Sequence, residues 1–234
     1  MDITGSVALV TGANRGIGRH FANQLLERGA EKVYATARHP ERVDLPGVSV
    51  LRLDVTDPDS VAAAAAAAGD VTLLVNNAGI ATGANLLGDL DKVRLEMETH
   101  FFGTLSVVRA FAPVLAAGGG GAIVNVLSAL SWFSYDGSNA YAAAKAAEWS
   151  LTNGVRLELA AQGTEVTGIH VGAVDTDIMA GYDGPKVDPA DVVRAALDGL
   201  EAGKLEVVVD DWSAMIKATL SGDPAAFYTP ATTS

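Results

Sequence analysis

Tyr141 and Lys145 stand four residues apart in the alanine-rich stretch 139–147. Alanine favours helix more than any other residue, and side chains four positions apart share one helix face, so the two side chains should be neighbours. A fixed ammonium favours the phenolate and acts to lower the tyrosine pKa from its usual value of about 10. The stretch therefore predicts a tuned general acid or base, and the alternative interpretation is a solvated helix face.

Tyr182 and Lys186 repeat the same spacing further along the chain. Gly184 and Pro185 lie between them, and both residues oppose a helix. The helical scaffold that brings a tyrosine and a lysine together is therefore expected only in 139–147.

A glycine-rich loop, TGANRGIG, follows the apolar run VALV near the start of the chain. Gly12, Gly16 and Gly18 fall between a predicted strand and a predicted helix, which is the context of a dinucleotide-binding loop. Glycine permits a tight turn and close approach to a pyrophosphate, and a helix N-terminus attracts its charge. The spacing is G-x3-G-x-G rather than G-x-G-x-x-G, and a turn without a ligand is the alternative.

The second apolar run, KVYATAR, indicates which dinucleotide binds. An NAD-binding fold usually has Asp or Glu near the end of this strand to hold the ribose hydroxyls. Ala37 stands there instead, Arg38 follows it, and Arg15 lies in the glycine loop. Two guanidinium groups without a carboxylate suit the 2′-phosphate of NADP, and two solvated surface arginines are the alternative.

The strands and helices that position these residues are predicted from short apolar runs that alternate with alanine-rich stretches. Continuous apolar runs are typical of strands covered on both faces of a parallel sheet, so the chain predicts a single-domain, doubly wound α/β fold of about seven strands, a Rossmann-type sheet. Its ligands should bind at the carboxyl ends of the strands. The predicted strands are Val7–Val10, Lys32–Ala35, Val48–Leu53, Val71–Val75, Ala122–Val126, Val166–Val171 and Glu206–Val209.

Helices are expected between these strands. Asp57-Pro58 and Asp188-Pro189 each read as an N-cap followed by proline at the first helical position. The alanine run after Asp57 predicts a helix closed by Gly69. Two longer helices are predicted over 89–117, with Pro113 bending or ending the first, and over 139–161.

The composition excludes several functional classes. Cysteine is absent, so disulfides, thiol nucleophiles and thiolate metal sites are excluded, and the four scattered histidines lack metal-ligand spacing. The net charge of -12 disfavours non-specific nucleic-acid binding. The chain has neither a secretory leader pattern nor an apolar run of membrane-spanning length, so we expect a cytoplasmic protein without a membrane partner.

Taken together, these residues resemble the short-chain dehydrogenases/reductases over 5 to about 210. Five motifs match in order and spacing, which is far more specific than any one of them. The matching segments are Thr11-Gly12 with Gly16 and Gly18, Asp54-Val55, Asn76 to Gly79, Ser128 with Tyr141 and Lys145, and VGAVDTD containing Thr176.

The resemblance implies a mechanism. Ser128 hydrogen-bonds the substrate carbonyl oxygen, Tyr141 delivers or takes the proton, and Lys145 lowers the tyrosine pKa and binds the nicotinamide ribose. The hydride passes between nicotinamide and the carbonyl carbon. The implied cofactor contacts are Gly12, Asn14, Arg15, Gly16, Ile17, Gly18, Arg38, Asp54, Val55, Asn77, Ala78, Gly79, Tyr141, Lys145, Val174 and Thr176.

Three positions depart from the family pattern. His100 stands where the family usually has an asparagine that serves a proton relay to the lysine, and Val171-Gly172 replaces its usual Pro-Gly. A neutral imidazole also donates and accepts a hydrogen bond, so His100 is a predicted relay residue, expected neutral beside Lys145, and packing alone is the alternative. The tail at about 211–234 lacks the usual glycine-rich final strand.

The expected function is that of an NADP-dependent carbonyl reductase or alcohol dehydrogenase, acting on a small to medium hydrophobic ketone or aldehyde. Trp132 and Phe133 are expected either to line its pocket or to pack in the core. The short segment after Thr176 predicts a small lid and an open cleft. The alternatives are a cofactor-binding regulatory protein with little turnover and a lyase or epimerase, because fold does not fix reaction.

A homo-oligomer is also expected. The predicted helices 89–117 and 139–161 carry the family's usual dimer faces, and closed symmetric assemblies are the common form of such chains. The unusual tail leaves dimer and tetramer as equal alternatives.

Overall fold

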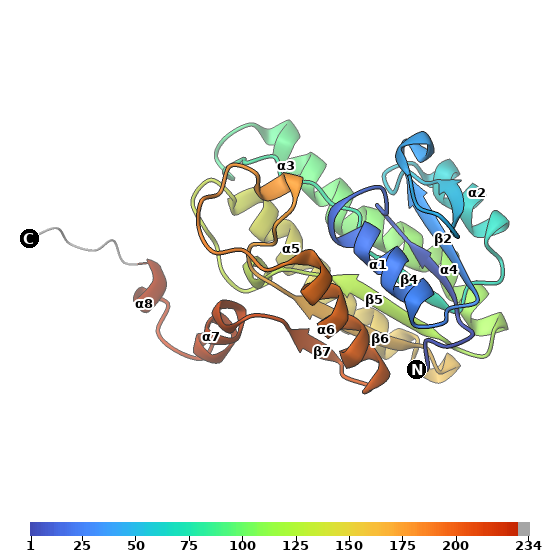
Figure 1. The fold of residues 1–234 in the computed structure, drawn as a ribbon. Coiled ribbons are helices and arrows are strands. Elements are labelled where there is room, and N and C mark those ends of the chain that lie inside the picture. Colours follow the sequence, from blue (N-terminus) through green and yellow to red (C-terminus); the bar gives the residue numbers. More distant parts are fainter. Residues whose placement is uncertain (229–234) are drawn as a thin grey trace, which may run out of the picture.

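A seven-stranded parallel sheet forms the centre of the computed structural model, which describes residues 1–228 (Figure 1). Its strand order, β3-β2-β1-β4-β5-β6-β7, runs outward in both directions from β1 and β4, as in the predicted doubly wound fold. The predicted strands are confirmed with small changes at their ends. They are β1 (Val7–Val10), β2 (Lys32–Ala37), β3 (Ser49–Arg52), β4 (Leu73–Asn76), β5 (Ala122–Val126), β6 (Glu165–His170) and β7 (Glu206–Val208).

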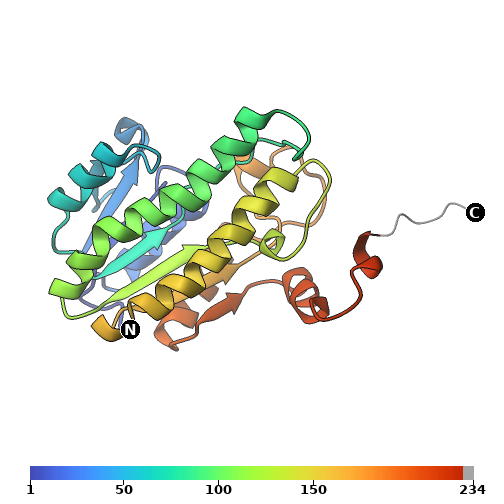
Figure 2. The ribbon, with the colours of Figure 1, turned by 180° about the vertical axis from the view of Figure 1, so that it is seen from behind.

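Helices cover both faces of the sheet. On one face lie α1 and α6, whose Phe21, Leu25 and Leu197 are fully buried in one core (Figure 1). On the other face lie α2, α4 and α5, seen in Figure 2, where Phe111 and Leu115 of α4 are fully buried. The helix bounds are α1 (Gly16–Glu27), α2 (Pro58–Ala67), α3 (Leu90–Met97), α4 (Thr104–Ala117), α5 (Asn139–Glu158) and α6 (Pro189–Glu201).

The predicted helix caps are present. The Asp57 carboxylate accepts a hydrogen bond from the backbone N–H of Asp59 at 3.1 Å, and the Asp188 carboxylate accepts one from Ala190 at 2.7 Å. In both cases the following proline occupies the first helical turn, where no N–H is needed. The helix after Asp57 ends at Ala67, slightly before the predicted Gly69.

The predicted helix 89–117 is interrupted near its middle. A π-helical stretch, Glu98–Gly103, separates α3 from α4. Pro113 lies inside α4, which continues to Ala117, so proline does not end this helix. The irregular stretch carries His100, and such π-helical insertions often occur at functional sites.

Leu90–Ala117 is long and apolar enough to cross a membrane by length and composition alone, with a mean hydropathy of 1.4 over its most apolar window. In the fold this segment packs against the sheet through Val107, Phe111 and Leu115, all of them fully buried. These three apolar residues therefore serve the core of the fold.

The C-terminal segment extends beyond the sheet as α7 (Asp211–Thr219) and α8 (Ala225–Tyr228) (Figures 1 and 2). Asp210 caps α7, and its carboxylate also accepts a hydrogen bond from the Gly172 backbone N–H at 2.7 Å. The C-terminal segment is thereby tied to the loop that follows β6. Residues 229–234 of the predicted tail lie outside the described residues.

Candidate active site

A cavity of about 1170 Å³ opens at the carboxyl ends of the strands. It gathers almost every residue predicted from the sequence. The predicted residues that line it are Gly12, Asn14, Arg15, Gly16, Ile17, Arg38, Asp54, Val55, Asn77, Ala78, Gly79, His100, Ser128, Tyr141, Lys145, Val174 and Thr176. The exception is Gly18, which is buried in the first turn of α1.

The glycine loop has the geometry of a phosphate cradle. Gly16 has a φ of +52°, in the left-handed region that favours glycine, and it begins α1. A Cβ at Gly18 would collide with the Gly12 carbonyl and the Asn77 amide, so this glycine allows the loop to pack against the turn after β4. The N-terminus of α1 is thereby presented to the cavity, where its dipole attracts an anion.

Cationic side chains lie beside the end of β2. Ala37 ends the strand and lines the cavity with Arg38, as predicted. Arg42, on the 3-10 turn Pro40–Arg42, also lines the cavity and was not predicted from the sequence. Arg15 was expected to contact the 2′-phosphate of NADP, but in the structure its guanidinium forms an ion pair of 3.0 Å with the Asp177 carboxylate.

Polar residues after β1, β3 and β4 fix the other walls of the cleft. The Asp54 carboxylate accepts hydrogen bonds from the Thr56 N–H at 3.0 Å and its hydroxyl at 2.8 Å. The Asn77 side-chain amide donates to the Thr11 carbonyl at 2.9 Å. These contacts hold the loops at the sheet edge and preorganise the cleft.

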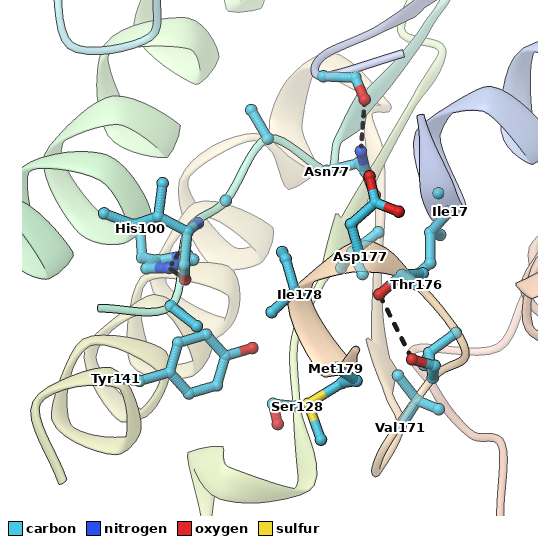
Figure 3. A pocket seen from close by; sticks show the side chains of 18 of the residues that line it. Ile17, Asn77, His100, Ser128, Tyr141, Val171, Thr176, Asp177, Ile178 and Met179 are labelled. Carbon is cyan, nitrogen blue, oxygen red and sulfur yellow. Dashed lines mark hydrogen bonds between the residues drawn. The ribbon is translucent and has the colours of Figure 1, made fainter. Parts of the chain in front are cut away.

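Ser128, Tyr141 and Lys145 meet on one side of the cavity. Ser128 caps a short 3-10 turn after β5, and its Oγ accepts a hydrogen bond from the Leu130 N–H at 3.1 Å. Tyr141 and Lys145 share one face of α5, with the Lys145 Nζ 5.8 Å from the centre of the tyrosine ring. The Tyr141 hydroxyl and Ser128 lie on the same side of the cavity, as Figure 3 shows. The predicted helical scaffold is therefore correct.

The pKa of Tyr141 differs from the expected direction. Burial of the phenol raises its pKa, Lys145 acts to lower it as expected, and Glu148 acts to raise it, with a net increase above the usual 10.0. Burial acts to lower the pKa of Lys145, but Glu148 and Tyr141 raise it further than burial lowers it. Lys145 alone predicts a lower pKa for Tyr141, but the desolvation of the phenol and the Glu148 carboxylate outweigh it.

His100 is buried among carboxylates. Its Nε2 lies 2.9 Å from the Ile80 carbonyl oxygen and 3.3 Å from a Glu96 carboxylate oxygen. Its Nδ1 is 3.9 Å from Glu148, and its ring meets that of Tyr141 edge-on at 5.2 Å. Figure 3 shows His100 and Tyr141 on the same wall of the cavity. The sequence predicted only Lys145 as a charged neighbour of His100, and the structure adds the carboxylates of Glu96 and Glu148.

Glu96 and Glu148 are the main site residues that sequence reasoning missed. The Glu148 side chain is 3% exposed and that of Glu96 is fully buried. Contacts with His100 and Thr82 hold the pKa of Glu96 below its ordinary value, although burial acts to raise it. A signal existed for Glu148, since it follows Lys145 by three residues and so shares its helix face.

Trp132 and Phe133 do not line the cavity, so the pocket interpretation of these two residues is wrong. Trp132 stacks on His170 with ring centroids 3.8 Å apart. Phe133 stacks on Tyr228 of α8 at 5.4 Å, and both aromatics therefore serve packing. An apolar wall is formed instead by Ile80, Leu95, Leu130, Tyr135, Ile178, Met179, Tyr182 and Trp212.

The segment after Thr176, predicted to form a small lid, has little regular structure. Asp177–Met179 forms a single 3-10 turn, and Figure 3 shows its Ile178 and Met179 facing the cavity. Tyr182 and Lys186 lie in the irregular segment that follows, where Lys186 pairs with Asp175 at 2.8 Å. This tyrosine and lysine therefore lack the helical arrangement of Tyr141 and Lys145.

The fold and this site define a class of oxidoreductase, and comparison with known sequences agrees. The sequence model of the short chain dehydrogenases matches residues 6–185, and the chain belongs to that family.

Particular relatives extend this result. A short chain dehydrogenase of Burkholderia cenocepacia J2315, solved in complex with NADP, is 40% identical with a TM-score of 0.93, covering 98% of each chain. An uncharacterised oxidoreductase of Staphylococcus aureus is 32% identical over 213 residues, 85% of this chain and 92% of the relative. The NADPH-dependent 1-acyldihydroxyacetone phosphate reductase of Schizosaccharomyces pombe is 37% identical over 182 residues, 74% of this chain and 61% of the relative.

Proposed function

We propose that this protein is an NADP-dependent oxidoreductase that interconverts a small to medium hydrophobic ketone or aldehyde and its alcohol. The observation that carries the proposal is the meeting of Ser128, Tyr141 and Lys145 at the wall of one cavity, beside a glycine cradle. A hydroxyl, a phenol and an ammonium in this arrangement bind a carbonyl oxygen and exchange a proton with it.

Each of the three side chains has a distinct role in this proposal. The Ser128 hydroxyl, whose position is fixed by its own 3-10 turn, donates a hydrogen bond to the substrate oxygen. The Tyr141 hydroxyl gives its proton to that oxygen in reduction and takes it back in oxidation. Lys145 stabilises the phenolate that remains, because its ammonium is held within the same buried group.

The cofactor is proposed to be NADP, which supplies or takes the hydride when bound. The cradle of Gly12 and Gly16 fits its pyrophosphate, and Arg38 and Arg42 beside Ala37 fit its 2′-phosphate. The NADP complex of the Burkholderia relative and the NADPH-dependent reductase of S. pombe support this choice.

The substrate class follows from the other end of the cavity. Leu130, Ile178 and Met179 present apolar surface there, and Trp212 adds an aromatic edge from α7. The nearby Lys186 and Arg15 are paired with Asp175 and Asp177. This distribution favours an uncharged, hydrophobic substrate.

The proposed reaction is tested by following NADPH consumption with a panel of hydrophobic ketones and aldehydes. Net consumption by the wild type, lost in Tyr141→Phe, is the expected result. Tight NADPH binding without consumption would point instead to a regulatory protein, and product formed without net consumption would point to a lyase or epimerase.

Assembly as a homo-oligomer is proposed on the surface of α4 and α5. A shallow groove between these helices is lined by residues of both, including the exposed Arg109, Pro113 and Glu158. Such a groove, shared by two exposed helices, suits packing against a second copy of the same helices. A cytoplasmic location stays a prediction.

A further inference from the structure

Glu148 is a buried carboxylate with contacts that the proposed function does not use. Its side chain is 3% exposed, on α5 one turn after Lys145. One oxygen accepts a hydrogen bond from the Lys145 ammonium at 2.6 Å, and the other accepts one from the Thr104 hydroxyl at 3.0 Å. Burial of a carboxylate is expensive unless it is paired and hydrogen-bonded, so these contacts hold it in place.

The Lys145 ammonium is held from two directions. Besides Glu148, it donates to the Val126 carbonyl of β5 at 2.8 Å. A donor fixed between a strand and a carboxylate cannot reorient freely, and its side chain is 6% exposed. Glu148 therefore helps to determine where the positive charge lies relative to the Tyr141 ring.

The charges facing this pair come from three segments. Glu148 lies on the same helix, His100 on the π-helical stretch, and Glu96 on α3. Two carboxylates therefore accompany one ammonium, and the ring of His100 lies between the carboxylates, 3.3 Å from Glu96 and 3.9 Å from Glu148. A negative charge close to a phenol disfavours its ionisation, and this acts against Lys145.

On this basis, and resting on the proposed function, we propose that Glu148 is a positioning residue of the Tyr141–Lys145 pair. Its carboxylate fixes the ammonium against β5, and its negative charge sets the pH range in which Tyr141 exchanges its proton. The direction is supported by the Tyr141 pKa, which burial raises, which Lys145 lowers, and which Glu148 raises again.

The proton balance is simple. In alcohol oxidation the Tyr141 phenolate takes the hydroxyl proton of the substrate while the hydride passes from its carbon to the oxidised nicotinamide of the proposed cofactor, so kcat/KM rises with pH until the phenolate is fully formed. Replacing Glu148 by a neutral residue removes one nearby negative charge. The rise should then occur at lower pH, by about one unit, the lower end of what an adjacent charge produces.

The experiment compares wild type with Glu148→Gln, which keeps the size and an acceptor oxygen but not the charge. kcat/KM for alcohol oxidation is measured across pH, and the Tyr141 signal is titrated by NMR in protein carrying ¹³C-labelled tyrosine, assigned with Tyr141→Phe. Both midpoints should move to lower pH. Glu148→Ala is a second neutral variant, in case Glu148→Gln does not fold.

Two controls separate charge from packing. Thr104→Val removes the hydroxyl that contacts Glu148 but keeps the carboxylate, so its midpoints should stay near those of wild type. Glu148→Asp keeps the charge and should restore most of the wild-type profile. A neutral variant that lowers activity or stability but leaves both midpoints unchanged over the pH range of the folded protein would overturn the proposal.

The NMR titration also distinguishes this proposal from the proposed function. If the wild type consumes no NADPH with any carbonyl compound, the proposed function fails. The titration of Tyr141 in the cofactor-free protein then still decides whether Glu148 governs its ionisation.

Discussion

Lowering the pH from 7 to 5 should destabilise the fold through His170, which lies beneath the backbone of Ser128. The imidazole is fully buried and stacks on Trp132. Its Nδ1 lies 3.1 Å from the Ser128 carbonyl oxygen, and its Nε2 lies 3.6 Å from the Glu206 carboxylate without a hydrogen bond. Nothing in this environment compensates fully for bringing a charged ring out of water.

The magnitude follows from the pKa. Burial lowers the pKa of His170 from 6.5 to about 4, outweighing the Ser128 carbonyl and Glu206, which both favour the charged form. Above pH 6.5 the ring is neutral in both the folded and unfolded states. Below it, the unfolded chain takes up a proton that the folded protein does not bind until about pH 4, so stability falls across this window.

At pH 5, about 1.5 units below the unfolded pKa, the free energy of unfolding should have fallen by about 2 kcal/mol, at about 1.36 kcal/mol per unit. For a chain of this size, that loss lowers Tm by roughly 4–8 °C.

Urea unfolding at pH 7 and pH 5, at one protein concentration, measures this loss. His170→Gln cannot titrate, so its stability should fall by about 2 kcal/mol less than that of wild type over the same change. His39→Gln is the matched control, because it makes the same substitution at an exposed histidine. Identical pH dependence in wild type and His170→Gln would refute the reasoning.

Four further predictions concern activity and assembly. Arg38→Asp should weaken NADPH binding about tenfold or more and reverse the preference, because a charged hydrogen bond contributes roughly 1.5–3 kcal/mol, and equal or tighter wild-type binding of NADH by calorimetry would contradict this. Tyr141→Phe should lose nearly all turnover with cofactor binding retained, whereas Tyr182→Phe should change little, and similar losses would show that the wrong tyrosine was chosen. His100→Asn should stay active and His100→Phe should lose turnover about tenfold or more, so full activity in a folded His100→Phe protein would show that the ring only packs. Light scattering at micromolar concentration should give a dimer or tetramer mass, and a monomer mass would exclude the oligomer.

Local patterns in the sequence were sufficient for the architecture. The apolar runs predict the strands because a strand covered on both faces has no polar side to show. Strand β3 lies at the edge of the sheet, and its residues alternate between half-buried and exposed. Its observed ends differ from the predicted ones by one residue each. The Tyr141–Lys145 pair was also predictable, because helical spacing alone places both side chains on one face.

Contacts between distant segments decided the rest. Glu96 and His100 are four residues apart and are neighbours by spacing, but Glu148 meets them only because the π-helical stretch, α3 and α5 pack side by side. The pKa of Tyr141 depends on this meeting, since desolvation and the added carboxylates reverse the direction that a neighbouring lysine alone predicts.

Contacts between distant segments also explain why the two aromatic residues after Ser128 do not line the cavity. The sequence placed Trp132 and Phe133 shortly after Ser128, but only the position of α7 and α8 directs Phe133 toward Tyr228. Trp132 turns to His170 for the same kind of reason, because β6 places that ring beneath it. The sequence by itself determined which residues reach the carboxyl edge of the sheet, because strand and helix periods are local. The tertiary structure decided which of them face the cavity and with what charge around them, because burial and electrostatic fields depend on every segment packed nearby.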